Sequence, residues 1–293
     1  MIFSIVIATK DRAGFLERAL ASLERQRDAP PFEVIVADNG SSDRTPEVVR
    51  EAAARGTLAV QSCFVAIPNR AAARNAGIAK AIGRFVLFVD DDVDVPEGFL
   101  AAHAAAQRGV FPLAVSGPIL NVPDYGARPL PRAVNYSAAF FCTCNVSVPR
   151  SALLAAGCFD ESFDLYGWED TELGLRLRRR DVRRVFAWDA YLWHIKPPRV
   201  ETFETTLQKT IERAQMAARF LRKDSSLRTK LATGAYGLNL LRSAMLAPGW
   251  SLGAYRQLAQ SERVPGFVRA MARAQLLDAA YVGTLRRAIA DLS

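Results

Sequence analysis

Short apolar runs alternate with amphipathic stretches over the first ninety residues, and this alternation restricts the fold more than any other feature. Buried strands are predicted for the runs at 2–8, 32–37, 58–65 and 85–89. Helices are predicted between them, at 12–26, 43–55 and 70–82. Strands separated by single helices predict an α/β fold with an open, mostly parallel sheet, whose ligands bind at the carboxyl ends of the strands.

The composition and the first apolar run limit the class of protein. Half of the 293 residues are apolar and 23% are charged, which suits a large folded core and excludes a disordered or fibrous chain. The four cysteines contain no C-x-x-C pair, so neither a disulfide framework nor a structural zinc site is expected. Residues 2–8 are too short for a signal peptide and have no basic flank, so we expect a cytoplasmic protein.

Three consecutive aspartates, Asp90, Asp91 and Asp92, follow the fourth predicted strand, and Asp38 follows the second. Neighbouring carboxylates raise one another's pKa unless a cation lies among them. Carboxylate ligands suit Mg²⁺ or Mn²⁺, whose shell is usually completed by substrate phosphate. An acidic cap on the following helix is the alternative interpretation.

The second half of the sequence contains another pair of carboxylates. A strand is predicted at 137–148 and a short helix at 149–157, followed by an aromatic, glycine-containing loop. This loop leads into a helix whose first turn carries Glu169 and Asp170. Negative charge there is ordinary helix capping, but the aromatic surroundings favour a sugar site. Six arginines follow between 176 and 184, most simply as a solvated face that also favours phosphate.

Histidine occurs twice, as His103 and His194. His103 lies in an alanine-rich helix, and we expect it to be incidental. His194 ends a strand-like run, and an oxygen-rich metal site accepts one imidazole.

Four motifs, in this order, resemble those of family 2 glycosyltransferases. They are Ser4-Ile-Val-Ile-Ala-Thr-Lys-Asp-Arg12, Asp38-Asn-Gly-Ser-Ser-Asp43, Ala73-Arg-Asn-Ala-Gly-Ile78 and Phe88-Val-Asp-Asp-Asp92. Gly167-Trp168-Glu169-Asp170 resembles the acceptor-side "ED" motif of the same enzymes, so the resemblance covers about residues 2–200. One departure is Pro68-Asn-Arg-Ala-Ala72, where the family usually has a glycine, and it affects the expected phosphate or ribose contacts.

The resemblance implies a GT-A fold with a catalytic domain over 1–202, divided into a nucleotide-binding half (1–95) and an acceptor-binding half (96–202). The implied activity is inverting transfer of a hexose from a nucleoside diphosphate, with a UDP-sugar as the first expectation. The implied acceptor is a hydroxyl of a glycan or lipid-linked glycan, as in bacterial-type surface polysaccharide synthesis. The implied cofactor is Mn²⁺ or Mg²⁺.

The same resemblance implies residue roles. The donor would be held by Thr9, Asp11, Arg12, Asp38, Asp90 and Asp91. Arg74 would support the pyrophosphate or hold the aspartate loop. The metal would be bound by Asp90, Asp92 and His194, with Asp92 as a direct ligand. Asp170 would be the catalytic base, and the acceptor would contact Tyr166, Gly167, Trp168 and Glu169.

Other functions lack the expected sequence features. A sugar-phosphate nucleotidyltransferase should carry a glycine-rich loop after the first strand, whereas residues 7–12 contain no glycine. A non-catalytic nucleotide-sugar or glycan-binding module should lose the aspartates or the Glu169–Asp170 pair, and both are present. Nucleic-acid binding is not expected, because the basic tail carries no recognised motif.

The net charge of +8 lies wholly in the tail, 203–293, which holds 14 Lys and Arg against 6 Asp and Glu. A basic amphipathic helix is predicted at 203–223, and the apolar stretch 231–255 is too interrupted to span a membrane. Two interpretations remain open: helices packed on the catalytic domain, or a peripheral element on the anionic inner face of the cell membrane, with Tyr236, Trp250 and Tyr255 at the interface. The oligomeric state is not predicted.

Overall fold

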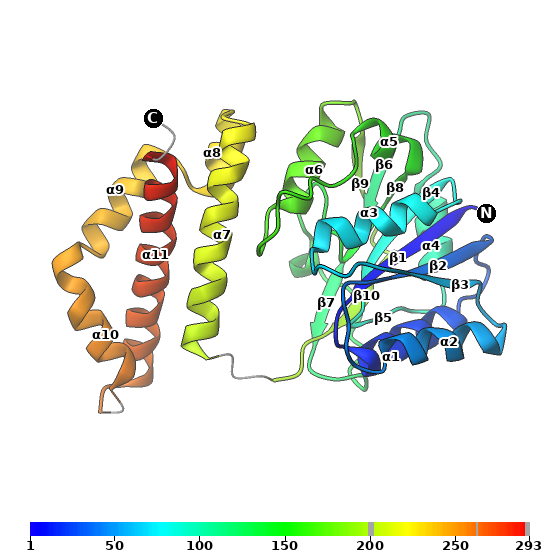
Figure 1. Cartoon of the computed structure of the whole chain (residues 1–293), viewed down its shortest axis with the longest axis horizontal. Helices are drawn as coiled ribbons and strands as arrows, with labels where there is room; N and C mark the ends of the chain where they lie inside the picture. The colour runs from blue at the N-terminus through cyan, green and yellow to red at the C-terminus, as the bar shows by residue number, and fades with distance from the viewer. Residues whose placement is uncertain (199–201, 262, 291–293) are drawn as a thin grey trace. The chain divides into compact units, whose positions relative to one another are not determined.

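The computed structural model describes residues 1–198, 202–261 and 263–290 (Figure 1). These residues form two compact units. The first comprises 1–164 and 169–198, and the second comprises 165–168, 202–261 and 263–290. The last four residues of the loop that precedes Glu169, 165–168, therefore belong to the second unit.

The first unit is built on a seven-stranded sheet of order β3-β2-β1-β4-β8-β6-β9. Its strands are β1 (Phe3–Thr9), β2 (Phe32–Asp38), β3 (Val60–Phe64), β4 (Phe85–Asp90), β6 (Leu113–Ser116), β8 (Asn145–Pro149) and β9 (Arg183–Phe186). The pairs β1·β2, β1·β4, β2·β3 and β6·β9 are parallel, whereas β8 is antiparallel to both β4 and β6. The predicted mostly parallel α/β sheet is confirmed.

Helices cover both faces of this sheet (Figure 1). Ile5 and Ile7 point to α1 (Ala13–Glu24), α2 (Thr45–Arg55) and α4 (Phe99–Ala106). Val6 points to the opposite face, which is covered by α3 (Arg70–Lys80), α5 (Arg150–Ala155) and α6 (Glu169–Arg178). Alternate residues of a buried strand enter opposite cores, which explains the continuous apolar runs of the sequence.

A second, three-stranded sheet lies at the carboxyl end of β4. Its order is β5-β10-β7, with β5 (Val93–Asp94), β7 (Ile119–Val122) and β10 (Leu192–Ile195). His194 pairs with Val93 on one side and Asn121 on the other, and Ile195 N donates to Asp92 O at 2.7 Å. This register brings His194 beside the third aspartate.

The predicted strand at 137–148 is wrong over most of its length, because only β8, from Asn145, joins the sheet. Residues 133–135 form a short 3-10 helix, and 137–144 form no strand. Phe141 is buried against α6 instead, where a Cβ at Gly174 would lie 2.8 Å from the Phe141 Cβ. Burial against a helix, not strand pairing, accounts for the apolar content of this segment.

His103 also differs from expectation, because it is completely buried. Its Nδ1 lies 3.0 Å from Ser147 Oγ and its Nε2 lies 3.0 Å from Asn145 Oδ1. Burial lowers the pKa of His103 to about 4. The imidazole is thus a structural link between α4 and β8.

The second unit is helical. It contains α7 (Phe203–Lys223), α8 (Leu227–Thr233), α9 (Gly237–Leu246), the 3-10 turn Gly249–Ser251, α10 (Leu252–Gln260) and α11 (Gly266–Ala290). The helix predicted at 203–223 has these bounds in the structure, and α7 packs along α11. Among the described residues, no helix combines the length and apolar content needed to cross a bilayer.

Candidate functional site

The carboxyl ends of the central strands bring the predicted donor-side residues to one edge of the sheet. Thr9 pairs with Asp38 in the β1·β2 register, and the preceding Ala8 pairs with Asp90 in the β1·β4 register. The parallel order predicted from the sequence therefore places the ends of three strands side by side.

Asp91 is buried and bound by residues of the first strand and the loop after it. Thr9 Oγ1 donates to Asp91 Oδ2 at 2.7 Å, and Arg12 Nη1 donates to Asp91 Oδ1 at 2.6 Å. Burial raises the pKa of Asp91 to about 6 against the opposing effect of Arg12 and Thr9. The hydrogen bonds among these three side chains hold the loop at 90–92 against the end of β1.

Asp92 is buried among cationic and imidazole groups. Arg12 Nη1 and Lys196 Nζ lie 3.1 and 3.0 Å from its Oδ2, and His194 Nε2 lies 2.9 Å from its Oδ1. Burial alone would raise the pKa of Asp92, but His194, Arg12 and Lys196 outweigh burial and hold it well below its usual value. The protein's own side chains thus neutralise part of the charge for which a bound cation was expected.

Lys196 was missed by sequence reasoning. It follows His194 by two residues along an extended segment, and residues two apart on such a segment point to the same side. This spacing was the available signal.

The His194 imidazole is oriented from its other nitrogen. Nδ1 lies 3.0 Å from Asn121 Oδ1. Nε2 is buried and makes no contact of hydrogen-bond geometry, despite its 2.9 Å distance to Asp92 Oδ1. The imidazole thus lies between Asn121 and Asp92, with its Nε2 directed at the Asp92 carboxylate.

A group able to hold a metal ion lies at the same place. Asp90, Cys144 and His194 each offer one ligand atom, and these three atoms all lie within 4.8 Å of one another. Asp90 and His194 belong to the predicted metal set, and Asp92 contacts His194 directly. Cys144 was missed because its position depends on the β4·β8 register, in which Asn145 pairs with Val89. Burial raises the pKa of Cys144 well above its usual value, so the sulfur is a neutral thiol.

Arg74 connects the aspartates to the second carboxylate pair. Its Nη1 donates to Glu169 Oε1 at 3.2 Å, and its Nη2 lies 4.0 Å from Asp90 Oδ1. The close packing of α3 on β1 sets the position of Arg74. Gly77 permits this packing, because a Cβ at that residue would lie 2.6 Å from Val6 Cγ1. Arg74 thus sits between the two carboxylate groups that the sequence singled out.

Asp170 lies half-buried in the first turn of α6. Its Oδ1 accepts a hydrogen bond from its neighbour Thr171 N at 2.7 Å. Burial, and then the charge of Glu169, raise the pKa of Asp170 to about 6, against a lowering effect of Arg74. A carboxylate that accepts a proton near neutral pH has the property required of a general base.

Asp11 and Asp38 organise the turn after β2. Asp11 Oδ1 accepts from Ser42 N at 2.6 Å, and Asp38 Oδ1 accepts from Ser41 N at 2.8 Å. Hydrogen bonds from Ser42 lower the pKa of Asp11. The two carboxylates hold the 39–43 turn against the loop after β1.

Tyr166, Gly167 and Trp168 belong to the helical unit. The Trp168 indole is buried, and its Nε1 donates to Arg213 O of α7 at 2.9 Å. Gly167 and Trp168 have φ of +95° and +76°, in the left-handed region. Of these three residues predicted, with Glu169, to contact the acceptor, Tyr166 is exposed, whereas Trp168 anchors the loop to α7.

Several known proteins are similar to this chain in sequence. Residues 4–116 match the family model described as glycosyl transferase family 2. Two validoxylamine A glucosyltransferases, from Streptomyces hygroscopicus subsp. limoneus and subsp. jinggangensis, are 30% identical over 271 residues, which cover 78% of this chain. The chain spans 58% and 63% of the length of these relatives.

Solved structures show the same fold. The mannosyltransferase PcManGT from Pyrobaculum calidifontis, in complex with GDP-Man and Mn²⁺, has a TM-score of 0.64 at 20% identity, covering 97% of this chain and 86% of that one. S. aureus TarS 1–349 in complex with UDP-GlcNAc has a TM-score of 0.58 at 21% identity, covering 98% and 91%. The expected GT-A-type fold is confirmed, and the expected resemblance to glycosyl transferase family 2 is confirmed by the match of residues 4–116 to its model.

Proposed function

We propose that the chain is a metal-assisted, inverting transferase that moves a hexose from a nucleoside diphosphate to a hydroxyl of a glycan acceptor. The observation that carries this proposal is Arg74, which lies 3.2 Å from Glu169 and 4.0 Å from Asp90. Through one guanidinium, the aspartates assigned to the donor and the carboxylates assigned to the acceptor form a single cluster. Direct transfer requires the two substrates to be held side by side in this way.

The donor nucleotide would lie at the ends of β1 and β2. Asp38 and Asp11 shape the turn there, while Thr9, Arg12 and Asp91 bond to one another and fix the floor of the site. We therefore assign Thr9, Arg12 and Asp91 mainly to holding the loop. A UDP-sugar remains our first expectation for the donor.

A divalent cation fits the residues beside β4. Asp90 offers a carboxylate, and His194 Nε2 lies 2.9 Å from Asp92 Oδ1, with Asn121 in contact with the other ring nitrogen. When bound, Mn²⁺ or Mg²⁺ would stabilise the negative charge of the leaving diphosphate as a Lewis acid. Arg12 and Lys196 keep Asp92 ionised for this purpose.

Asp170 would take the proton of the acceptor hydroxyl. Its raised pKa suits proton transfer near neutral pH, and a single displacement with inversion needs only this one base. Glu169, held by Arg74 through Oε1, has a second carboxylate oxygen, Oε2, which is buried without a hydrogen-bond partner among the described residues. We assign that oxygen to orienting the acceptor hydroxyl.

We infer that the acceptor is a glycan or a lipid-linked glycan of the kind used in surface polysaccharide synthesis. Several apolar side chains of the helical unit are exposed, among them Leu238, Met245 and Trp250. Together with the excess of positive charge in 203–293, they support peripheral contact with an anionic bilayer.

The test is a panel of nucleotide sugars incubated with the purified chain, with and without Mn²⁺, followed by assay of nucleoside diphosphate release and thermal shift. Metal-dependent release from one donor is the expected result. Formation of a nucleotide sugar from a nucleoside triphosphate and a sugar phosphate would identify a nucleotidyltransferase instead. Donor binding with no turnover toward any acceptor would identify a binding module.

A further inference from the structure

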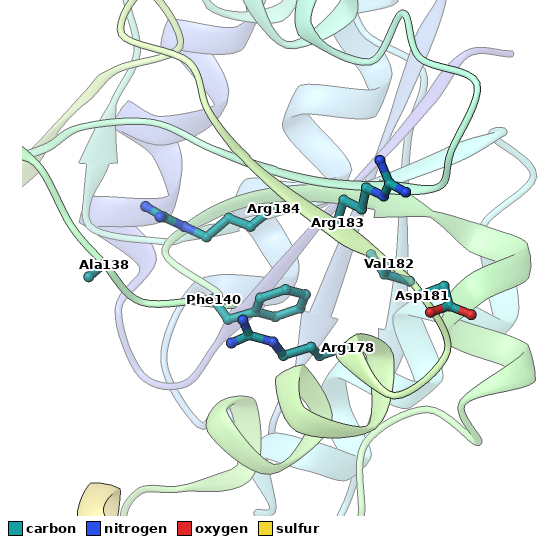
Figure 2. Close-up of a pocket in the computed structure, with 7 residues that line it drawn as sticks. All are labelled: Ala138, Phe140, Arg178, Asp181, Val182, Arg183 and Arg184. Atoms are coloured by element: carbon teal, nitrogen blue, oxygen red, sulfur yellow. The ribbon is translucent and has the colours of Figure 1, made fainter. Parts of the chain in front are cut away.

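The edge strand β9 and the end of α6 border a hollow of about 460 Å³ in the first unit (Figure 2). It is lined by Ala138, Phe140, Arg178, Asp181, Val182, Arg183 and Arg184. Figure 2 shows the guanidinium groups of Arg178 and Arg184 on the side of the hollow near Ala138, whereas Arg183 and Asp181 point away. Two cationic groups thus converge on one part of the hollow.

The carboxylate of Asp181 also lines the hollow, but it points away from the guanidinium groups of Arg178 and Arg184 (Figure 2). Within 1–198, 202–261 and 263–290, no ion pair is formed by Arg178, Arg183 or Arg184. The guanidinium of Arg178 lies over the Phe140 ring at 5.6 Å, and that of Arg184 is held by Tyr136 Oη and Ser137 O. The buried Nε of Arg184 lacks a hydrogen-bond partner among the described residues. Positioned, unpaired guanidinium groups of this kind bind phosphate or carboxylate groups.

An aromatic cluster of Tyr136, Phe186 and Trp188 adjoins the hollow through Arg184. The ring centroids of Tyr136 and Phe186 lie 4.9 Å apart, and those of Phe186 and Trp188 lie 5.0 Å apart. Arg184 lies over both Tyr136 and Phe186, at 5.3 and 5.5 Å. Tyr136 is 53% exposed and Trp188 is 43% exposed. The exposed rings offer an apolar face on which a sugar ring can stack, and the neighbouring Arg184 offers a positive charge to an anionic group on that sugar.

The position of the cluster connects it to the catalytic edge. Phe186 pairs with Ser116 of β6, which pairs with Val146 of β8, and β8 pairs with β4 beside Asp90. Three strand spacings therefore separate Asp90 from the end of β9, or about 14 Å along the same edge. Arg178 lies eight residues along α6 from Asp170, a distance of about 12 Å.

We propose that Arg178, Arg184 and the Tyr136–Phe186–Trp188 cluster form a subsite for an anionic glycan, on which the acceptor chain rests while its terminal hydroxyl lies at Asp170. This inference rests on the proposed function and names its acceptor class: a glycan that carries carboxylate or phosphodiester groups. The sugar rings would stack on the exposed aromatics, and one anionic group would lie between the two guanidinium groups.

The test is calorimetric titration of the full chain, without donor, with three hexamers: oligogalacturonate, glycerol phosphate and neutral cellohexaose. We expect at least one anionic hexamer to bind about tenfold or more tightly than cellohexaose, since a charge-assisted contact has this effect. Preference for one of the two anionic hexamers identifies the anionic group. Equal binding of all three, or no binding of either anionic hexamer, would overturn the proposal.

Variants locate the binding. Arg178→Gln and Trp188→Ala should each weaken binding of the anionic hexamer about tenfold, whereas Arg180→Gln, outside the hollow on the same turn of chain, should leave it unchanged. Wild-type affinity in Arg178→Gln would overturn the proposal, and melting temperatures verify that each variant is folded. These substitutions should not affect hydrolysis of the donor in the absence of an acceptor. If neither the wild type nor any variant hydrolysed a donor, this result would contradict the proposed function but not the glycan subsite.

Discussion

The guanidinium Nη1 of Arg74 donates to Oε1 of Glu169 at 3.2 Å, although 95 residues separate the two along the chain. Both side chains are buried, and each comes from a helix on the same face of the sheet. The pair therefore ties the first half of the catalytic unit to the carboxylates assigned to the acceptor.

Arg74→Gln should destabilise the fold and reduce transfer. Removal of the cation leaves Glu169 buried without its partner, which costs about 3–5 kcal/mol of unfolding free energy. Urea denaturation measures this loss, with Lys80→Gln at the exposed end of the same helix as the control. Equal stability of the two variants would show that the pair contributes little.

Asp170→Asn should abolish transfer, by about 10²–10⁴-fold, and leave donor affinity unchanged. In the wild type, kcat/KM should fall about tenfold for each pH unit below 6, because the pKa of Asp170 is raised to about 6 and the base acts only when unprotonated. A pH–rate profile and donor titration check both statements. A flat profile down to pH 5, or turnover in the variant, would assign the base elsewhere.

Asn121→Ala should weaken Mn²⁺ binding about 10–100-fold, because the acceptor that orients His194 Nδ1 is lost. Asn121→Asp keeps an acceptor at this position and should retain the affinity. Titration of the donor-free protein with Mn²⁺, followed by the rise in melting temperature, measures the difference. Similar affinities for wild type and Asn121→Ala would remove His194 from the metal set.

His103 should make stability depend on pH. Its pKa is about 4 in the fold, where it is buried, against about 6.5 when unfolded. The unfolded chain therefore binds more protons between these values, and the stabilisation is complete above about pH 6.5 and declines as the pH falls toward 4. The loss is on the order of 3 kcal/mol at most.

Chemical denaturation at pH 7 and pH 5 measures this change. His103→Gln does not titrate, and its unfolding free energy should change less between these two pH values than that of the wild type. The same pH dependence in both proteins would assign the effect to other groups.

Trp250→Glu should reduce co-sedimentation with phosphatidylglycerol vesicles if the helical unit lies on membranes, since Trp250 is 88% exposed. Val110→Glu, at an equally exposed apolar position of the first unit, is the matched control. Failure of the wild-type chain to bind these vesicles at low salt would contradict membrane association.

The sequence by itself determined the four strands β1–β4, the helices between them and the edge at which the aspartates meet. Parallel strands joined by single helices must end on the same side, so Thr9, Asp38 and Asp90 were certain to gather once the apolar runs were assigned to strands. The bounds of α7 were also predictable, because an amphipathic period over 21 residues is a strong local signal.

Only the tertiary structure decided how the charges are balanced and what surrounds them. Cys144 reaches Asp90 through the antiparallel register of β8, and Lys196 reaches Asp92 through the second sheet. The pairing of Arg74 with Glu169 and the convergence of Arg184 with Tyr136 likewise join distant segments. Strand register and helix packing are set by the burial of whole faces of strands and helices. This burial is a property of the assembled core, so no short stretch of sequence predicts it.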